Sequence, residues 1–368
     1  MIGTTFAGKY KIEAELSSDA LGTTYRALRT ADGEGMLLLV FDAGITPDAD
    51  QVSHILNTSK KVASLGHSVL VPVIEWLEPG TDTLAACVWP LEDAIPFAEF
   101  AKGGVDLGDA LDVAAQVAQA MEIAANAGLE LKDLSANSLR VSVLADGGQI
   151  PRITRWGFDT ILPPYSPRNK GEAFFGTPEY MAPETCSGKG WTIQSDLYSL
   201  GILLYQMIAG KPPFISSNPN TTLKRQIYEK PLPLHLLKRG VSHINEFEKV
   251  IFQVLQKMPA KRPETAGEMA ALLSEFKGTH LPEVDFTNSP PAQWPQAVTT
   301  AGVEQAAPAS DPNEPAQTLT FKGLGEVDAQ EGPDAHAVSH QGAEDVADTM
   351  RMERQDEEPE PKPEPKPE

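Results

Sequence analysis

Two charged residues near the middle of the chain are the first candidates for chemistry. Asp133 lies in the segment LKDLSANS (131–138), and Arg155 follows the strand-like run RIT (152–154). An Asp in such a loop either accepts a proton or holds backbone N–H groups in place. A guanidinium binds carboxylates and phosphates, whereas magnesium requires oxygen ligands. Arg155 therefore cannot be a metal ligand.

Two longer motifs follow these residues. The first is GTPEYMAPE (176–184), and the second is SDLYSLG (195–201), which opens a long apolar stretch ending at GKPPF (210–214). This ordered pair resembles the end of the activation segment and the central helix of bacterial-type Ser/Thr protein kinases. The chain is similar to this family from about Gly8 to Lys277.

The resemblance implies an α+β, two-lobed fold. A small lobe of five strands and one main helix is expected over 1–92, and a larger, mostly helical lobe over 93–280. The composition then changes to Pro, Ala, Glu and Gln, with too few apolar residues to offset the entropy of ordering. Residues 281–368 are therefore predicted to form a disordered acidic tail. Within it, the strand-like island at 317–322 is a candidate docking or phosphorylation motif.

Hydrophobic periodicity agrees with this division. Turn residues at 146–148 separate two short strand-like runs, which predicts a hairpin in the large lobe. Small-lobe strands are predicted over 10–15, 23–28, 36–41, 70–77 and 84–90. Helices are predicted over 48–65, 107–127, 196–209, 245–257 and 264–277.

Charge and cysteine content bear on partners and location. The net charge is −21, of which residues 281–368, with 19 acidic and 5 basic side chains, contribute −14. The remainder carries −7 and does not favour nucleic acid or an anionic membrane. No membrane span is visible, because the longest apolar run (200–209) is too short. Cys87 and Cys186 are too few for a disulfide framework or a zinc site, so a cytoplasmic location is predicted.

Under the resemblance, residues 16–27 form the glycine-rich flap that covers the phosphates of ATP. Gly22 is retained and is a candidate cofactor contact, but Ser17 and Asp19 replace the first two glycines. A carboxylate and extra bulk at these positions disfavour a tight phosphate cradle. The segment is therefore predicted to be an ordinary β-hairpin.

The phosphate-binding lysine of the next strand is missing. Leu39 or Val40 stands in its place, and Thr58 stands where the family has the carboxylate partner of that lysine. Because a buried charge without a partner is costly, the loss of both members together is expected.

The resemblance assigns Asp133 as the base that accepts the proton of the substrate hydroxyl. Ser135 replaces the lysine that steadies the phosphoryl group, and Ser138 replaces the metal-binding Asn. Asn137 lies one residue early and could serve only after a local shift. Without these positioning partners, Asp133 is not expected to be productive.

Arg155 replaces the metal-binding Asp of the family, so both magnesium positions lose oxygen ligands. Arg155 is expected to form an ion pair with Asp133 or with Asp19. The alternative is that Arg155 binds the phosphates of ATP weakly and without metal. We therefore expect no cofactor, or weak metal-independent ATP binding.

The family's structural positions are retained. An ion pair between Glu184 and Arg262 is expected, and Asp196 is expected to hold the backbone of the catalytic loop. Leu131 and Trp156 keep the apolar bulk of the family's internal hydrophobic spine, with Val62 as a neighbour. Two further residues belong to the strand that frames the adenine slot. These are Trp89, expected in the core or at the rear of the slot, and Pro90, which removes a backbone N–H at the hinge.

The leading hypothesis is a pseudokinase that serves as a binding or allosteric signalling module for a protein partner that the sequence does not identify. One alternative is an active Ser/Thr kinase or another transferase with a remodelled, metal-independent site using Asp133 and Arg155. Another is a structural tether whose acidic tail carries the interaction. Ser166, before Pro167, is a candidate phosphorylation site whose phosphate Lys132 could receive.

Overall fold

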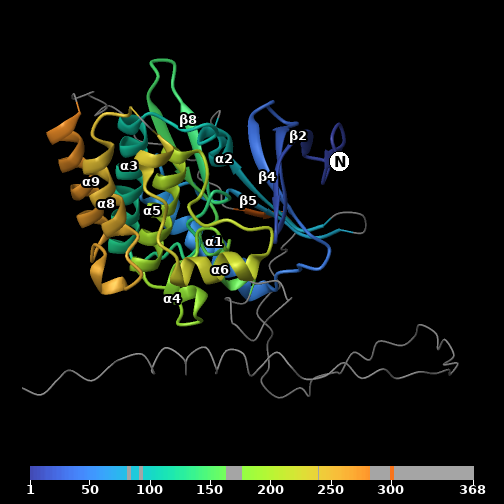
Figure 1. The fold of residues 1–368 in the computed structure, drawn as a ribbon. Coiled ribbons are helices and arrows are strands. Elements are labelled where there is room, and N and C mark those ends of the chain that lie inside the picture. Colours follow the sequence, from blue (N-terminus) through green and yellow to red (C-terminus); the bar gives the residue numbers. More distant parts are fainter. Residues whose placement is uncertain (81–83, 91–93, 163–175, 239, 282–298, 302–368) are drawn as a thin grey trace, which may run out of the picture. The chain divides into compact units, whose positions relative to one another are not determined.

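The computed structural model describes residues 1–80, 84–90, 94–162, 176–238, 240–281 and 299–301. Figure 1 shows a lobe built on a β-sheet beside a lobe of helices. Both lobes lie within one compact unit that ends at Ala306. No helix of the described residues is long and apolar enough to cross a membrane.

The small lobe contains a seven-stranded sheet. Its order is β1-β2-β3-β4-β6-β5-β10, and all neighbours are antiparallel except β5 and β10. The central strand β4 is apolar on both faces because both faces are covered. The strands are β1 Thr5–Phe6, β2 Tyr10–Asp19, β3 Gly22–Arg29, β4 Gly35–Phe41, β5 Glu75–Leu77, β6 Ala86–Pro90 and β10 Thr299–Ala301.

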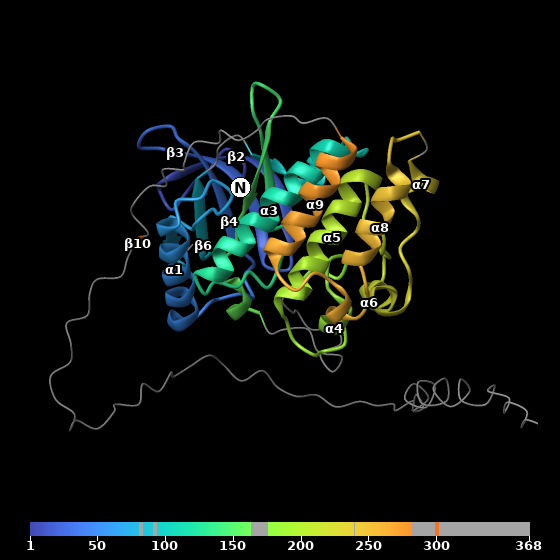
Figure 2. The same cartoon turned by 90° about the vertical axis from the view of Figure 1, so that its left-hand side faces the viewer.

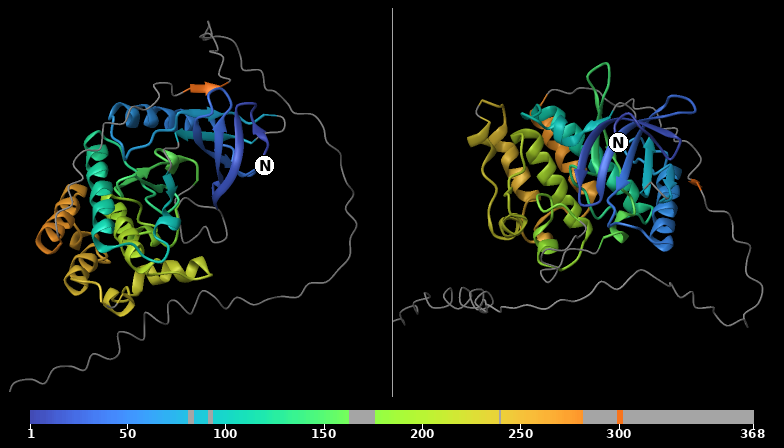
Figure 3. Two further views of the ribbon diagram at one scale, coloured as in Figure 1. Left: turned by 90° about the horizontal axis from the view of Figure 1, so that it is seen from above. Right: turned by 90° about the vertical axis from the view of Figure 1, so that its right-hand side faces the viewer.

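The main helix of the small lobe, α1 (Ala49–Ser64), lies beside this sheet in Figure 3. It begins with a capping box, in which Asp48 accepts the N–H of Gln51 and the Gln51 side chain accepts the N–H of Asp48, both at 2.9 Å. Its apolar face, including Ile55, packs in one cluster with Leu39 of β4. The prediction of a helix over 48–65 is confirmed.

Four helices run side by side in the large lobe (Figure 2). They are α3 (Leu107–Asn126), α5 (Ile193–Ala209), α8 (Ile244–Val254) and α9 (Ala266–His280). Helix α5 is buried all round, as its apolar sequence predicts. The shorter elements are α2 Phe97–Phe100, η1 Phe158–Thr160, α4 Pro183–Cys186, α6 Pro219–Tyr228, α7 Leu234–Leu237 and η2 Pro259–Lys261.

A second sheet joins the lobes. Strands β7 (Ala94–Pro96), β8 (Leu139–Val143) and β9 (Gln149–Ile153) form it in that order. The N–H of Val71 donates to the carbonyl of Ile153 at 2.9 Å, so the chain before β5 pairs with β9. The strand predicted over 70–77 is thus confined to β5, because Val71 bonds to the large lobe and the N–H of Val73 donates to the Ser59 hydroxyl of α1.

Strand β10 is an exception to the predicted disordered tail. Its three residues pair in parallel with β5, in the register Thr299 to Glu75 and Ala301 to Leu77. The island at 317–322 and the rest of the tail from residue 302 lie outside the described residues.

Aromatic rings connect the two lobes. Phe158 of η1 is fully buried in the small-lobe core, with its ring centroid 5.7 Å from that of Trp89 and 6.3 Å from that of Phe41. Phe41 in turn lies 5.3 Å from Trp76. Phe158 therefore anchors the segment after Arg155 in the core of the other lobe, where the rings gain packing beyond their buried area.

Candidate functional site

Arg155 is bonded to Asp19. Its Nη1 lies 2.6 Å from Oδ2 of Asp19, and the two side chains are 5% and 14% exposed. The other Asp19 oxygen accepts the N–H of Leu21 at 2.9 Å, in the two-residue turn between β2 and β3. Leu21 is itself buried in the small-lobe core. Of the two partners predicted for Arg155, Asp19 is the one that forms the ion pair. The predicted hairpin is present, and its tip is bonded to Arg155.

The backbone of Arg155 is also unusual. Its φ is 65°, in the left-handed region that side chains other than glycine rarely adopt. Such conformations persist where the surrounding structure fixes them, and they concentrate at functional sites and their remnants. Here the ion pair with Asp19 holds the side chain of Arg155, and the buried rings of Trp156 and Phe158 hold the backbone that follows it.

Gly22 is explained by backbone packing. Its φ is 145°, and a Cβ at this position would lie 2.1 Å from the carbonyl oxygen of Val40 on β4. Any side chain would therefore push β3 away from β4. The flanking replacements are paired with β3, Ser17 opposite Thr24 and Asp19 opposite Gly22, after a register shift between Glu15 and Ser17.

Asp133 is buried beside this ion pair. It lines a cavity of about 150 Å³ together with Arg155, Asn137, Asp19 and Pro178. Burial raises the pKa of its carboxyl to about 8, Arg155 opposes the shift, and Asp19 and Asp196 add to it. Near neutral pH the group is therefore largely protonated, which is the wrong state for a base.

Ser135 and Ser138 serve the loop itself. The Ser138 hydroxyl donates to the carbonyl of Asp133 at 2.6 Å and accepts the N–H of Ser135 at 2.9 Å. The Ser138 carbonyl accepts from the N–H of Thr154 at 2.8 Å. The hydroxyl at the position of the metal-binding Asn is thus used to close a backbone turn.

The structure decides between Leu39 and Val40. Leu39 is fully buried in the cluster that contains the apolar face of α1, whereas Val40 faces the opposite cluster of the sheet. Leu39 therefore takes the place of the lysine. Thr58 lies against Gly157, where a Cβ would come within 3.2 Å of the Thr58 side chain. Neutral side chains replace both members of the family's ion pair.

Sequence reasoning missed Arg140. It lies on β8 and is only 4% exposed, between the lobes and beside Pro90. Burial lowers the pKa of its guanidinium to about 10, and the charge of Arg155 adds to the effect. The available signal was a charged residue between Leu139 and Val141, in a strand that both lobes cover.

The predicted structural contacts are confirmed. Arg262 and Glu184 form a bidentate pair with distances of 2.7 and 2.8 Å, and the Arg262 side chain is completely buried. Burial raises the pKa of Glu184, but its bonds with Arg262 outweigh this and hold the pKa below its usual value. Oδ2 of Asp196 accepts the N–H of Lys132 at 3.1 Å and so anchors the catalytic loop to α5.

The apolar spine is also as predicted. Leu131, Trp156 and Val62 are buried in one cluster of the core. The indole N–H of Trp156 donates to the carbonyl of Ile153 at 3.1 Å, so the larger ring has a polar partner. Trp89 is core, as expected, and contacts Phe158.

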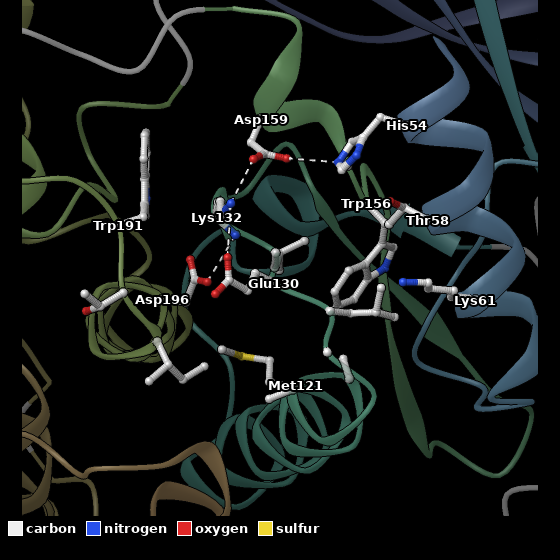
Figure 4. Close-up of a pocket in the computed structure, with 18 residues that line it drawn as sticks. His54, Thr58, Lys61, Met121, Glu130, Lys132, Trp156, Asp159, Trp191 and Asp196 are labelled. Carbon is white, nitrogen blue, oxygen red and sulfur yellow. Dashed lines mark hydrogen bonds and ion pairs between the residues drawn. The ribbon is translucent and has the colours of Figure 1, made fainter. Parts of the chain in front are cut away.

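The charge of Lys132 is balanced by two carboxylates. Figure 4 shows it between Asp159 and Glu130, in a cavity of about 340 Å³ that has Trp156 and Trp191 on opposite sides. Its Nζ lies 3.1 Å from the Asp159 carboxylate and 3.0 Å from that of Glu130. Ser166, the predicted donor of a phosphate to this lysine, lies outside the described residues.

Comparison with known proteins gives the same family. The model of the protein kinase domain matches residues 10–273. The chain belongs to the protein kinase family.

Curated relatives of this kinase-family chain include bacterial Ser/Thr protein kinases. It is 25% identical to the serine/threonine-protein kinase PknA of Mycobacterium tuberculosis, over 82% of this chain and 69% of that one. It is 24% identical to the serine/threonine-protein kinase pkn2 of Myxococcus xanthus and 29% identical to the kinase RqkA of Deinococcus radiodurans, each over 73% of this chain. The matched region spans only 32% and 40% of those two relatives.

Solved structures show the protein-kinase fold. The kinase domain of Mycobacterium tuberculosis PknI has a TM-score of 0.54 and 20% identity, and the match covers 76% of this chain and 99% of that one. A double mutant of the same domain has a TM-score of 0.54 over 75% of this chain and 98% of that one. The predicted two-lobed fold is thereby confirmed.

Kinase chemistry needs ATP and magnesium, and the residues present do not fit them. A guanidinium stands at the metal position and holds the carboxylate of the flap, while Ser138 is turned into its own loop. Magnesium binds oxygen ligands in a near-octahedral array, and the described part of this cleft does not offer that arrangement.

Proposed function

We propose that this protein is a pseudokinase, a kinase-family domain that does not transfer phosphate and instead serves as a binding or allosteric signalling module. The ion pair between Arg155 and Asp19 carries this proposal, because it joins the metal position to the flap that should cover the phosphates. The neutral Leu39 and the protonated Asp133 support it.

The distribution of changes supports a module with a preserved shape. Apart from Asp133, the residues that would move a phosphoryl group are replaced, whereas those that hold the large lobe together are kept, including the Glu184–Arg262 pair and Asp196. Interactions such as these stabilise a surface that a partner can recognise. The partner is proposed to be a protein, with no nucleic acid or membrane involved.

A phosphate-transfer assay tests this proposal. The full chain is incubated with radiolabelled ATP, with magnesium or manganese, and with a generic Ser/Thr protein substrate, next to the Asp133→Ala variant. We expect no labelling of the substrate or of the chain above that of Asp133→Ala. Labelling that depends on Asp133 would sink the proposal.

A remodelled transferase is the second candidate. It is favoured by one observation, the cavity of about 150 Å³ that Asp133 and Arg155 line together. A thermal-shift titration with ATP discriminates, since a ligand at a hundred times its Kd stabilises by about 2.7 kcal/mol. A shift with ATP in the presence of a chelator favours this candidate, whereas no shift with or without metal favours the pseudokinase without a cofactor.

Location and tail complete the proposal. Both cysteines, Cys87 and Cys186, are free and buried, which agrees with the proposed cytoplasmic location. The acidic tail is proposed as a linker or a bait for basic partners. If it were the whole interaction, as in the tether alternative, partners would be lost on deletion of residues 302–368.

A further inference from the structure

The slot beside the hinge is closed. Between the lobes, next to Pro90, the described residues leave a cavity of only about 10 Å³. Pockets for small ligands measure several hundred cubic ångströms, whereas a space of this size holds about one water molecule. Its lining includes Leu37, Val71, Pro90, Ala94, Arg140, Arg152 and Thr154.

Two of these side chains come from opposite lobes. Leu37 projects from β4 on the small-lobe side and is 3% exposed. Arg140 projects from β8 on the large-lobe side and is 4% exposed, and its Nη1 has no hydrogen-bond partner among the described residues. A buried guanidinium without a carboxylate is costly. Among the described residues no ion pair holds Arg140 in this position, so its position depends on the packing of its side chain.

The shape of the group matters. A guanidinium is a flat, delocalised plane, and Leu37 of one lobe and Arg140 of the other line a slot of only about 10 Å³. An adenine ring would need the same space, against the strand that ends at Pro90. The side chain and the ring are therefore mutually exclusive.

We propose that Arg140 occupies the place of the purine and that the slot is a latent binding site for flat heteroaromatic rings, closed by this one side chain. The inference rests on the proposed function, because it gives the reason why this kinase-family domain does not hold a nucleotide. Nucleotide binding would thus be prevented at two separate places. Arg140 fills the site of the adenine ring, and the Asp19–Arg155 ion pair lies where the family binds the phosphates.

The test uses the full chain and adenosine, which carries no phosphate and so avoids the Arg155 region. Arg140→Ala and Arg140→Val remove the plug, and Val retains the β-strand preference of β8. Arg140→Met is the matched control, since it removes the charge and keeps the bulk. Binding is measured by saturation-transfer NMR with millimolar adenosine and by thermal shift, and circular dichroism verifies that each variant is folded.

We expect Arg140→Ala or Arg140→Val to bind adenosine with a Kd at least about tenfold below the lower limit for the wild type, while the wild type and Arg140→Met give no signal. The inference is overturned if the wild type binds as well as Arg140→Ala, or if both small variants are folded and give no signal. The second outcome would leave the proposed function standing. Phosphate transfer by the wild type would instead refute the proposed function.

Discussion

Asp19 at the tip of the β2–β3 hairpin and Arg155 at the metal position of the family lie 2.6 Å apart, Oδ2 to Nη1, and both are largely buried. One ion pair therefore joins the tip of this hairpin to the position where the family has its metal-binding Asp. Its two members are far apart in the sequence. Because both are largely buried, replacing either one alone would leave a buried charge without its partner.

The energy of this ion pair can be measured with a double-mutant cycle. Asp19→Ala leaves the Arg155 guanidinium buried without a carboxylate, and we expect it to lower the free energy of unfolding by about 3 kcal/mol. Asp19→Ala with Arg155→Met should recover most of this loss, because no buried charge remains. Urea unfolding provides the measurement. As a control, Glu13→Ala breaks the ion pair with Arg26, which at 3.4 Å is longer and more exposed than that of Asp19 with Arg155, and should cost less than about 1 kcal/mol.

Asp133 predicts a specific pH dependence. Its pKa in the folded state, about 8, lies above that of an unfolded Asp, so the folded state binds the extra proton between about pH 4 and pH 8. Stability must then fall as the pH rises through this window. Asp133→Asn should reduce the slope and be more stable than the wild type at pH 8, by on the order of 1–3 kcal/mol, with little difference at pH 4.

Thermal unfolding at a series of pH values checks this prediction. Part of the slope should survive in Asp133→Asn, because burial also raises the pKa of Asp196 to about 7. A variant that is less stable than the wild type at pH 8 would mean that the carboxylate is ionised and needed.

The Glu184–Arg262 pair should be essential for the large lobe. Arg262→Ala leaves the nearly buried Glu184 carboxylate without a cation, with only the Ser195 hydroxyl bonded to it, so a loss of about 3–5 kcal/mol is expected in urea unfolding. Glu229→Ala is a suitable comparison, because its ion pair with Arg225 is long, at 3.6 Å, and exposed. That variant should change stability by less than about 1 kcal/mol. Equal effects of the two variants would contradict the structural role of Arg262.

Phe158 should contribute strongly to stability. Phe158→Ala removes a fully buried ring from the small-lobe core and is expected to cost about 3–5 kcal/mol. Tyr228→Ala removes an aromatic ring that is 75% exposed and should be nearly neutral, within about 0.5 kcal/mol. Differential scanning calorimetry should also show separate transitions for the two lobes in Phe158→Ala if this ring is what makes them unfold together.

The sequence predicted most of this architecture, because motifs and periodicity specify local structure well. The hairpin at Asp19 follows from the residues themselves, and the Glu184–Arg262 pair and the packing of Trp156 follow from the resemblance to the kinase family. The choice between Asp19 and Asp133 as the partner of Arg155 did not follow, because it depends on how far the hairpin tip reaches across the lobes.

Arg140 shows a second limit of sequence reasoning. Alternation along a strand would turn Arg140 and Ser142 toward water, yet both are buried, since β8 is covered on each side. The burial of a charged side chain on such a strand comes from tertiary packing. The alternation of side chains along a strand, with its period of two residues, does not predict it.

The position of the Phe158 ring has a mechanical consequence. Rocking of one half of the molecule against the other, by which many two-part proteins admit and release ligands, would pull this ring out of a filled apolar interior. We therefore expect the two lobes to keep one relative arrangement. Under the proposed function, regulation would then depend on which partner binds the surface of the domain, and not on a change between open and closed forms.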